Sequence, residues 1–413
     1  MRQSIHQVVL VPLEETYILR AYAQRLTMSS RSAFFPLLAA AIALVVVHGF
    51  GRFIYTPLIP LLVSDGLLTL QQAAQLATWN YVGYLSGAMI ALLAYQNGWG
   101  RSALLTGILG NAVITILQIG GDDYLYMAGL RLFNGITNGV VFVLAPALVL
   151  EWLAARNKAT LSGLMYLGVG AGLLVSNQIV ESTAIWLEGN DRWIPAAMAS
   201  IPLALWSGIY LFRLSSGDAP VSRDDHSALW DKQSTPLFLS YFGAGLGYIL
   251  PMTFLPAVAQ EWNIAVSPSP WLIVALASVP AIFIWNSLGN RMGDRNALVL
   301  NYAVQAISVA AILLLPKTVE GLWICAALMG GSFLGAVFLT QRLARTLHPH
   351  QGPRLSAALI ALYGVAQLLG PIVAEAGIHM GATLASTFIW GLGACVWALV
   401  LMLWVPKAGR VHS

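Results

Sequence analysis

Twelve long apolar segments constrain this 413-residue chain more than any other feature of its sequence. Hydrophobic residues make up 58% of the chain and charged residues only 9%, whereas soluble domains carry about 25% charged residues. Stretches of about 20 apolar residues are long enough to cross a bilayer as α-helices, so the sequence predicts an all-α membrane protein. The expected spans lie at roughly 34–63, 72–96, 102–120, 124–152, 159–180, 193–213, 235–259, 270–289, 296–316, 319–341, 355–377 and 380–406.

The positive charges collect on one side of the predicted bundle. Of the 21 Lys and Arg residues, 17 fall at the chain ends and in alternate loops, and only Arg192 and Lys317 lie on the other side. Loops rich in Lys and Arg stay in the cytoplasm, so we expect both termini there and the protein in the plasma membrane, the inner membrane of a bacterium. The pI near 9.1 follows from this asymmetry and requires no nucleic-acid partner.

An internal repeat divides the chain into two halves. Matched glycines in three pairs of spans are each 196 residues apart. This offset predicts an N-terminal half at 33–213 and a C-terminal half at 235–406. Residues 1–32 lack the pattern of a secretory signal and are expected to form a cytoplasmic extension, with translation starting at Met1 or Met28. A cytoplasmic linker at 214–234 and a cytoplasmic tail at 407–413 complete the division. The matched glycines are Gly49 and Gly245, Gly135 and Gly331, and Gly168 and Gly364.

Two arginines, Arg52 and Arg131, fall inside the first and fourth spans. An arginine at the centre of a membrane helix costs at least ~2.5 kcal/mol, so such residues usually serve a function. Their repeat images are Tyr248 and Ala327, which places the charge on one wall only. No acidic residue of the first half lies at the same depth, and the arginine fork suits carboxylate or phosphate. The pair therefore predicts an anion site, although Arg131 has the alternative role of tying the fourth helix to backbone carbonyls of the first.

Three residues of the first span form one helical stripe. His48, Arg52 and Tyr55 are spaced i, i+4 and i+7. Histidine exchanges protons readily near neutral pH, and an anion bound between His48 and Arg52 would favour its protonation. We therefore expect anion and proton to bind cooperatively. The alternative is a neutral histidine that is hydrogen-bonded within the bundle.

Uncharged side chains in the other spans are candidates for recognition of the same ligand. An aromatic wall opposite a cationic one suits a small organic anion with an apolar or ring portion. Packing between helices is the alternative role for each of these residues. The candidates are Tyr241, Tyr248, Trp285 and Gln367 in the second half and Asn138 in the fourth span.

Several local motifs resemble those of the major facilitator superfamily. Residues 83–101 are similar to its signature between helices two and three, and Arg291-Met292-Gly293-Asp294-Arg295 resembles the second copy. Arg131-Leu132-Phe133-Asn134-Gly135 resembles the fourth-helix arginine motif. More narrowly, residues 51–61 and 241–256 resemble the YbfB/YjiJ-type branch, and the likeness extends from about 33 to 406.

The resemblance implies twelve transmembrane helices in two pseudo-symmetric six-helix halves that rock around a central site. It also implies a cytoplasmic gate that includes Arg101, Asp294 and Arg295. The first copy of the signature departs from the family pattern, because Tyr95, Gln96 and Asn97 stand where an acidic residue is usual. The standard charge relay at that gate is therefore in doubt.

Together these features predict a secondary active transporter that moves a small organic anion by alternating access, coupled to protons and functional as a monomer in the lipid bilayer. Nucleotide-binding, metalloprotease and cysteine-cluster motifs are missing from the sequence, so we expect no enzyme, cofactor or metal. One alternative is efflux of drugs or metabolites, which the arginines disfavour for cations. Another is a transporter-like membrane sensor without transport.

Overall fold

The computed structural model describes residues 32–214, 230–232, 234–264, 266–348 and 352–406, and all regular structure in these ranges is helical. Twelve helical stretches there are long and apolar enough to cross a membrane, which confirms the predicted number of spans. The expected extension, linker and tail fall largely outside these residues, as does Met28.

The first six spans comprise α2(Phe34–Leu44), η1(Val45–Phe53) and α3(Tyr55–Ser64); α4(Leu70–Gln96); α5(Gly100–Leu117); α6(Tyr124–Ala154); η2(Ala159–Tyr166) and α7(Leu167–Thr183); and η3(Gly189–Trp193) and α8(Ile194–Arg213). The last six comprise α9(Thr235–Glu261); α10(Pro270–Met292); α11(Asp294–Leu314); α12(Val319–Gly330) and α13(Phe333–Leu347); α14(Gly352–His379); and η4(Ala385–Thr387) and α15(Phe388–Met402).

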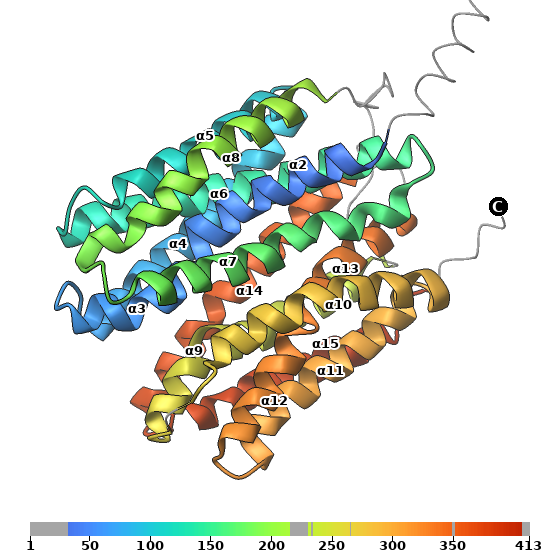
Figure 1. The fold of residues 1–413 in the computed structure, drawn as a ribbon. Coiled ribbons are helices and arrows are strands. Elements are labelled where there is room, and N and C mark those ends of the chain that lie inside the picture. The colour runs from blue at the N-terminus through green and yellow to red at the C-terminus, as the bar shows by residue number, and fades with distance from the viewer. Residues whose placement is uncertain (1–31, 215–229, 233, 265, 349–351, 407–413) are drawn as a thin grey trace, which may run out of the picture.

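The helices form two groups that lie side by side (Figure 1). The blue-to-green helices α2–α8 make one group and the yellow-to-red helices α9–α15 the other, with α14 and α10 facing α4 and α7 across the boundary. Because the number of spans is even, α2 begins and α15 ends at the same end of the bundle. We call that end the terminal face and the other end the opposite face.

The first span is continuous but not uniformly α-helical. Residues Val45–Phe53 form a π-helix, and the Ile54 N–H donates to the Gly49 carbonyl five residues earlier. Glycine lets this segment pack closely on α7: a Cβ added at Gly49 would lie 2.6 Å from the Gly172 Cα. π-helical turns are rare and are frequently found at functional sites. This turn contains Arg52, so the irregular backbone and the buried charge coincide.

The tenth span is interrupted, which the sequence analysis did not predict. Helix α12 ends at Gly330 and α13 begins at Phe333. The carbonyl groups at the break are satisfied by side chains, since Trp285 Nε1 donates to Gly331 O at 2.6 Å and Asn301 Nδ2 donates to Ser332 O at 2.9 Å. A break inside a membrane span is tolerated only when neighbouring groups satisfy the freed backbone.

Candidate substrate-binding site

A small cavity of about 50 Å³ lies between the two groups of helices. Its walls come from the parts of α3, α4, α6, α9 and α10 that are nearer the opposite face, together with the end of η1. Both buried arginines line it, as do the predicted residues Tyr55 and Tyr248. The fold thus brings four of the side chains predicted from the sequence to one cavity.

Arg52 connects the two groups of helices at the level of this cavity. Its Nη2 donates to the Gln367 side-chain oxygen on α14 at 2.6 Å. The guanidinium carbon also lies 5.2 Å from the ring centre of Phe53, 5.0 Å from Tyr81 and 4.8 Å from Tyr84. Arg52 is therefore enclosed by aromatic rings and bonded to a neutral amide.

Arg131 reaches the first span from α6. Its Nη1 donates to the Gly51 carbonyl at 3.0 Å, and its guanidinium carbon lies 4.3 Å from the Tyr55 ring centre. The Nε is buried and has no hydrogen-bond partner among the described residues. The bond to Gly51 is the structural role that we considered as an alternative.

Acidic side chains take no part in this arrangement. The ion pairs in the ranges that the structure describes include those of Arg192 with Asp65 and of Arg342 with Asp294, and neither cavity arginine pairs with an acidic side chain of these ranges. Each cation–π contact supplies about 0.5–2 kcal/mol, whereas removing a charge from water costs several kcal/mol per ion. Rings and neutral acceptors therefore offset part of the cost of burying the two arginine charges.

The other predicted binding residues fall outside the cavity wall. Asn138 Nδ2 donates to the Val47 carbonyl of the π-helix at 2.6 Å, so it supports the backbone next to Arg52. Trp285 bonds to the break between α12 and α13. Tyr241 stacks on Tyr363 with ring centres 4.4 Å apart, and Gln367 meets the site through Arg52.

His48 lies one helical turn from Arg52 and is buried among aromatic rings. Its ring centre is 4.5 Å from that of Phe142 and 5.7 Å from that of Phe53. Its Nδ1 is buried and has no hydrogen-bond partner among the described residues. The histidine is therefore near the charged site but outside the residues that line the cavity.

Several aromatic residues of the site were not predicted. Tyr81 and Tyr84 are three residues apart in α4, a spacing that places them on one helix face, and both rings meet Arg52. Tyr81 also approaches Thr253 of the other group, with the two hydroxyl oxygens 3.5 Å apart. Their spacing was visible in the sequence, but nothing in it indicated that this face meets Arg52.

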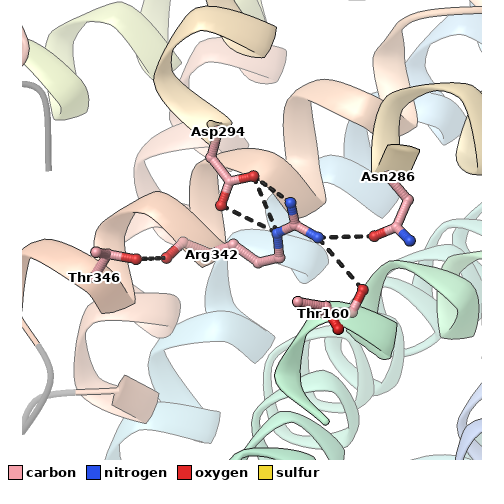
Figure 2. A network of polar contacts seen from close by, with 5 residues as sticks. All are labelled: Thr160, Asn286, Asp294, Arg342 and Thr346. Carbon is pink, nitrogen blue, oxygen red and sulfur yellow. Dashed lines mark hydrogen bonds and ion pairs between the residues drawn. The ribbon is translucent and has the colours of Figure 1, made fainter. Parts of the chain in front are cut away.

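A polar network closes the space between the groups near the terminal face (Figure 2). Arg342 of α13 pairs with Asp294, and its Nη1 donates to the Asn286 side chain at 2.8 Å and to the Thr160 carbonyl at 3.4 Å. Thr160 belongs to the first group and the other three to the second. Arg342 is thus hydrogen-bonded to both groups, and nothing in the sequence pattern indicates this role.

The three predicted gate residues have different surroundings. Asp294 lies in the network of Figure 2. Arg295 instead donates to the carbonyls of Val405 and Leu403 at the end of the chain's last span, each at 2.6 Å. Arg101 is exposed in the first turn of α5.

Aromatic rings fill the path from the cavity to this network. Starting next to Arg52, the rings are Tyr84, Phe142, Tyr166 and Phe338, and the centres of neighbouring rings are 5.9–6.2 Å apart. The path crosses from the first group of helices to the second between Tyr166 and Phe338. The Phe338 ring centre lies 5.9 Å from the Arg342 guanidinium carbon. The cavity is therefore separated from the terminal face by packed side chains.

Comparison with known proteins gives one family and several structures. The family model described as "Uncharacterised MFS-type transporter YbfB" matches residues 44–403. No curated protein matches the sequence. Similar structures include the MFS transporter FucP in the outward conformation, at 11% identity and a TM-score of 0.69, and the human organic anion transporter MFSD10, at 15% and 0.68. The match to FucP covers 91% of this chain and the match to MFSD10 covers 90%, and each covers 100% of the chain in the solved structure. These matches establish the major facilitator fold.

Proposed function

Since the chain belongs to the YbfB-type family of MFS transporters, we propose that this membrane transporter carries a small organic anion by alternating access. The observation that supports the anion most directly is the pair Arg52 and Arg131, which line one cavity without an acidic partner among the described residues. Two positive charges at one site would repel a cation, and the arginine fork suits a carboxylate.

The arrangement of the cavity supports a transport cycle that starts from the opposite face. The cavity walls lie toward that face, whereas rings and the Arg342 network fill the space toward the terminal face. With the termini in the cytoplasm, as the distribution of Lys and Arg favours, the opposite face is the outside of the plasma membrane. Rocking of the two halves would then separate Tyr166 from Phe338 and release the anion on the terminal side.

Proton coupling through His48 is the second part of the proposal. The unpartnered Nδ1 has a free position for a proton or a hydrogen bond, and the residue lies one turn from Arg52. An anion on Arg52 would lower the electrostatic cost of charging the imidazole, and by linkage the proton would strengthen anion binding. In proteoliposomes, anion uptake should carry protons, and His48→Ala should uncouple the two; proton flux that is unchanged in this variant would refute the role of His48.

A thermal-shift screen of the purified protein tests the substrate class. Organic anions should raise the melting temperature, and Arg52→Ala should abolish that rise. Arg213→Ala is the matched control because Arg213 is an exposed arginine at the end of α8, and its response should equal that of the wild type. Stabilisation by cationic drugs instead, or anion stabilisation that persists in Arg52→Ala, would overturn the proposal.

A further inference from the structure

Four aromatic rings of the second half form a nearly parallel stack beside the cavity. The ring of Tyr248 lies between Phe333, at 6.0 Å and 1°, and Tyr363, at 5.1 Å and 14°. Tyr241 follows Tyr363 at 4.4 Å and 15°. Tyr248 also lines the cavity that contains Arg52, so the stack extends from the charged site into the second half.

The two tyrosines farthest along the stack have buried hydroxyl groups without partners. Tyr241 is 0% exposed and Tyr363 is 3% exposed, and neither hydroxyl makes a hydrogen bond with a described residue. Buried polar groups are almost always bonded, so unpartnered ones require an explanation. Phenylalanine would fill both positions without this cost.

Neither tyrosine lines the present cavity, so these hydroxyls would meet only a ligand that reaches beyond the arginines and has more than a carboxylate. The arginines supply the charge that binds the carboxylate, and they belong to the first half. The hydroxyls supply two donors at the end of a row of flat rings, and they belong to the second half. A ligand that satisfies both halves has an anionic group and, across a planar ring, a neutral oxygen that accepts hydrogen bonds.

We infer that Tyr241 and Tyr363 form a hydroxyl subsite, and that the transported anion is an aromatic carboxylate with a hydroxyl or carbonyl oxygen on its ring. This inference rests on the proposed anion transport, and it gives residues of the second half a role in recognising the ligand. Tyr248 and Tyr363 each have a ring stacked on both sides, so a flat ligand would pack against the edges of this row of rings. The ligand enters the space that opens as the halves move apart, since the present cavity is smaller than an aromatic ring.

The test compares two probes, benzoate and 4-hydroxybenzoate, which differ by a single ring hydroxyl. Wild-type protein should bind 4-hydroxybenzoate more tightly, by about fivefold for each neutral hydrogen bond formed. The double variant Tyr241→Phe, Tyr363→Phe should bind both probes with the affinity that the wild type has for benzoate. Its melting temperature without ligand should equal or exceed that of the wild type, because two unpartnered hydroxyls have been removed.

Tyr302→Phe is the matched control. Tyr302 is equally buried in the same half, but its hydroxyl lies 3.3 Å from that of Thr340, so this variant should lose stability and keep the preference for 4-hydroxybenzoate. A double variant that retains the wild-type preference, or a wild type that binds benzoate through Arg52 without any preference, would overturn the hydroxyl subsite alone. Failure of both probes and of all other anions to bind would overturn the proposed function itself.

Discussion

Arg52 of the first half and Gln367 of the second are joined by a hydrogen bond of 2.6 Å between Nη2 and Oε1. This bond connects the halves beside the cavity, where the anion is proposed to bind. An arriving carboxylate would compete with the neutral amide oxygen for the same donor. Charge-assisted hydrogen bonds are about twice as strong as neutral ones, so the anion would displace Gln367 and loosen one link between the halves.

Substitution of Gln367 by glutamate tests this competition. Gln367→Glu places a carboxylate on Arg52 permanently, and we expect anion affinity to fall by about 10- to 100-fold, the factor of one hydrogen bond to a charged group. Titration of the purified protein with benzoate by calorimetry measures the change. Gln367→Leu is the control, since it removes the competing acceptor without adding a charge and should leave anion binding as tight as in the wild type or tighter. Equal loss of affinity in both variants would contradict the competition.

Close approach of η1 and α7 gives a second prediction. In Gly49→Ala the new Cβ would lie 2.6 Å from the Gly172 Cα and 3.0 Å from its carbonyl carbon, and these backbone atoms cannot move aside without shifting a helix. Overpacking of this kind costs about 1–3 kcal/mol, so the melting temperature should fall. Gly129→Ala in α6 is the control, because a Cβ there meets nothing within 4 Å and alanine favours the helix. A Gly49→Ala protein as stable as the wild type would show that this contact is loose.

More of the fold than of the candidate site could be predicted from the sequence. Twelve spans followed from their apolar length, because the bilayer imposes that length on each helix. The break at Gly331 could not be predicted in the same way, since the repeat partner Gly135 lies within the unbroken helix α6. The difference depends on Trp285 and Asn301, which satisfy the carbonyls at the break.

Within the site, charge was predictable, whereas among the contacts only the bond from Arg131 to the backbone of the first helix was anticipated, as an alternative role. Arg52 and Arg131 stand out because arginine is rare in membrane spans. Their neutral partners, Gln367 and the Gly51 carbonyl, depend on helix rotation, which sequence spacing does not specify. The rings of Tyr81 and Tyr84 could not be assigned to Arg52 for the same reason.

An ion pair on the opposite face makes stability depend on pH. Hydrogen bonds from Arg192 hold the pKa of the Asp65 carboxyl below its usual value of 3.8, and the Gly189 N–H contributes in the same direction. A lowered pKa in the folded state means that the pair stabilises the protein above about pH 3.8 and that this stability is lost as the pH falls through the folded-state pKa. Melting temperatures measured between pH 6 and pH 3 should show this acid loss.

Asp65→Asn should remove that part of the acid loss and lower the melting temperature at neutral pH. Asp122→Asn is the control, since Asp122 lies on the same face and accepts no hydrogen bond from the residues that the structure describes. Identical pH profiles for Asp65→Asn and the wild type would mean that the pair adds nothing to stability.

The Arg342 network near the terminal face gives the last prediction. Asp294 and Asn286 hold Arg342 so that its Nη1 reaches the Thr160 carbonyl of the other half. Arg342→Met removes these bonds, and we expect the halves to separate more often at this end, by about 10-fold if one charged hydrogen bond is lost. A cysteine at Ser162, which is 2% exposed in η2, reports the separation through its rate of reaction with a maleimide.

Arg295→Met, in protein that carries the same Ser162→Cys reporter, is the control. It distinguishes an effect of losing the network from an effect of losing any nearby arginine. Arg295 donates to the carbonyls of Val405 and Leu403 within its own half, so its removal should leave the labelling rate unchanged. The native Cys325 and Cys395 are buried and should contribute only a slow background, which protein without the reporter measures. A labelling rate that is the same in Arg342→Met as in the parent would show that the aromatic rings alone keep the halves together, because Tyr166 and Phe338 still stack between them at 6.2 Å.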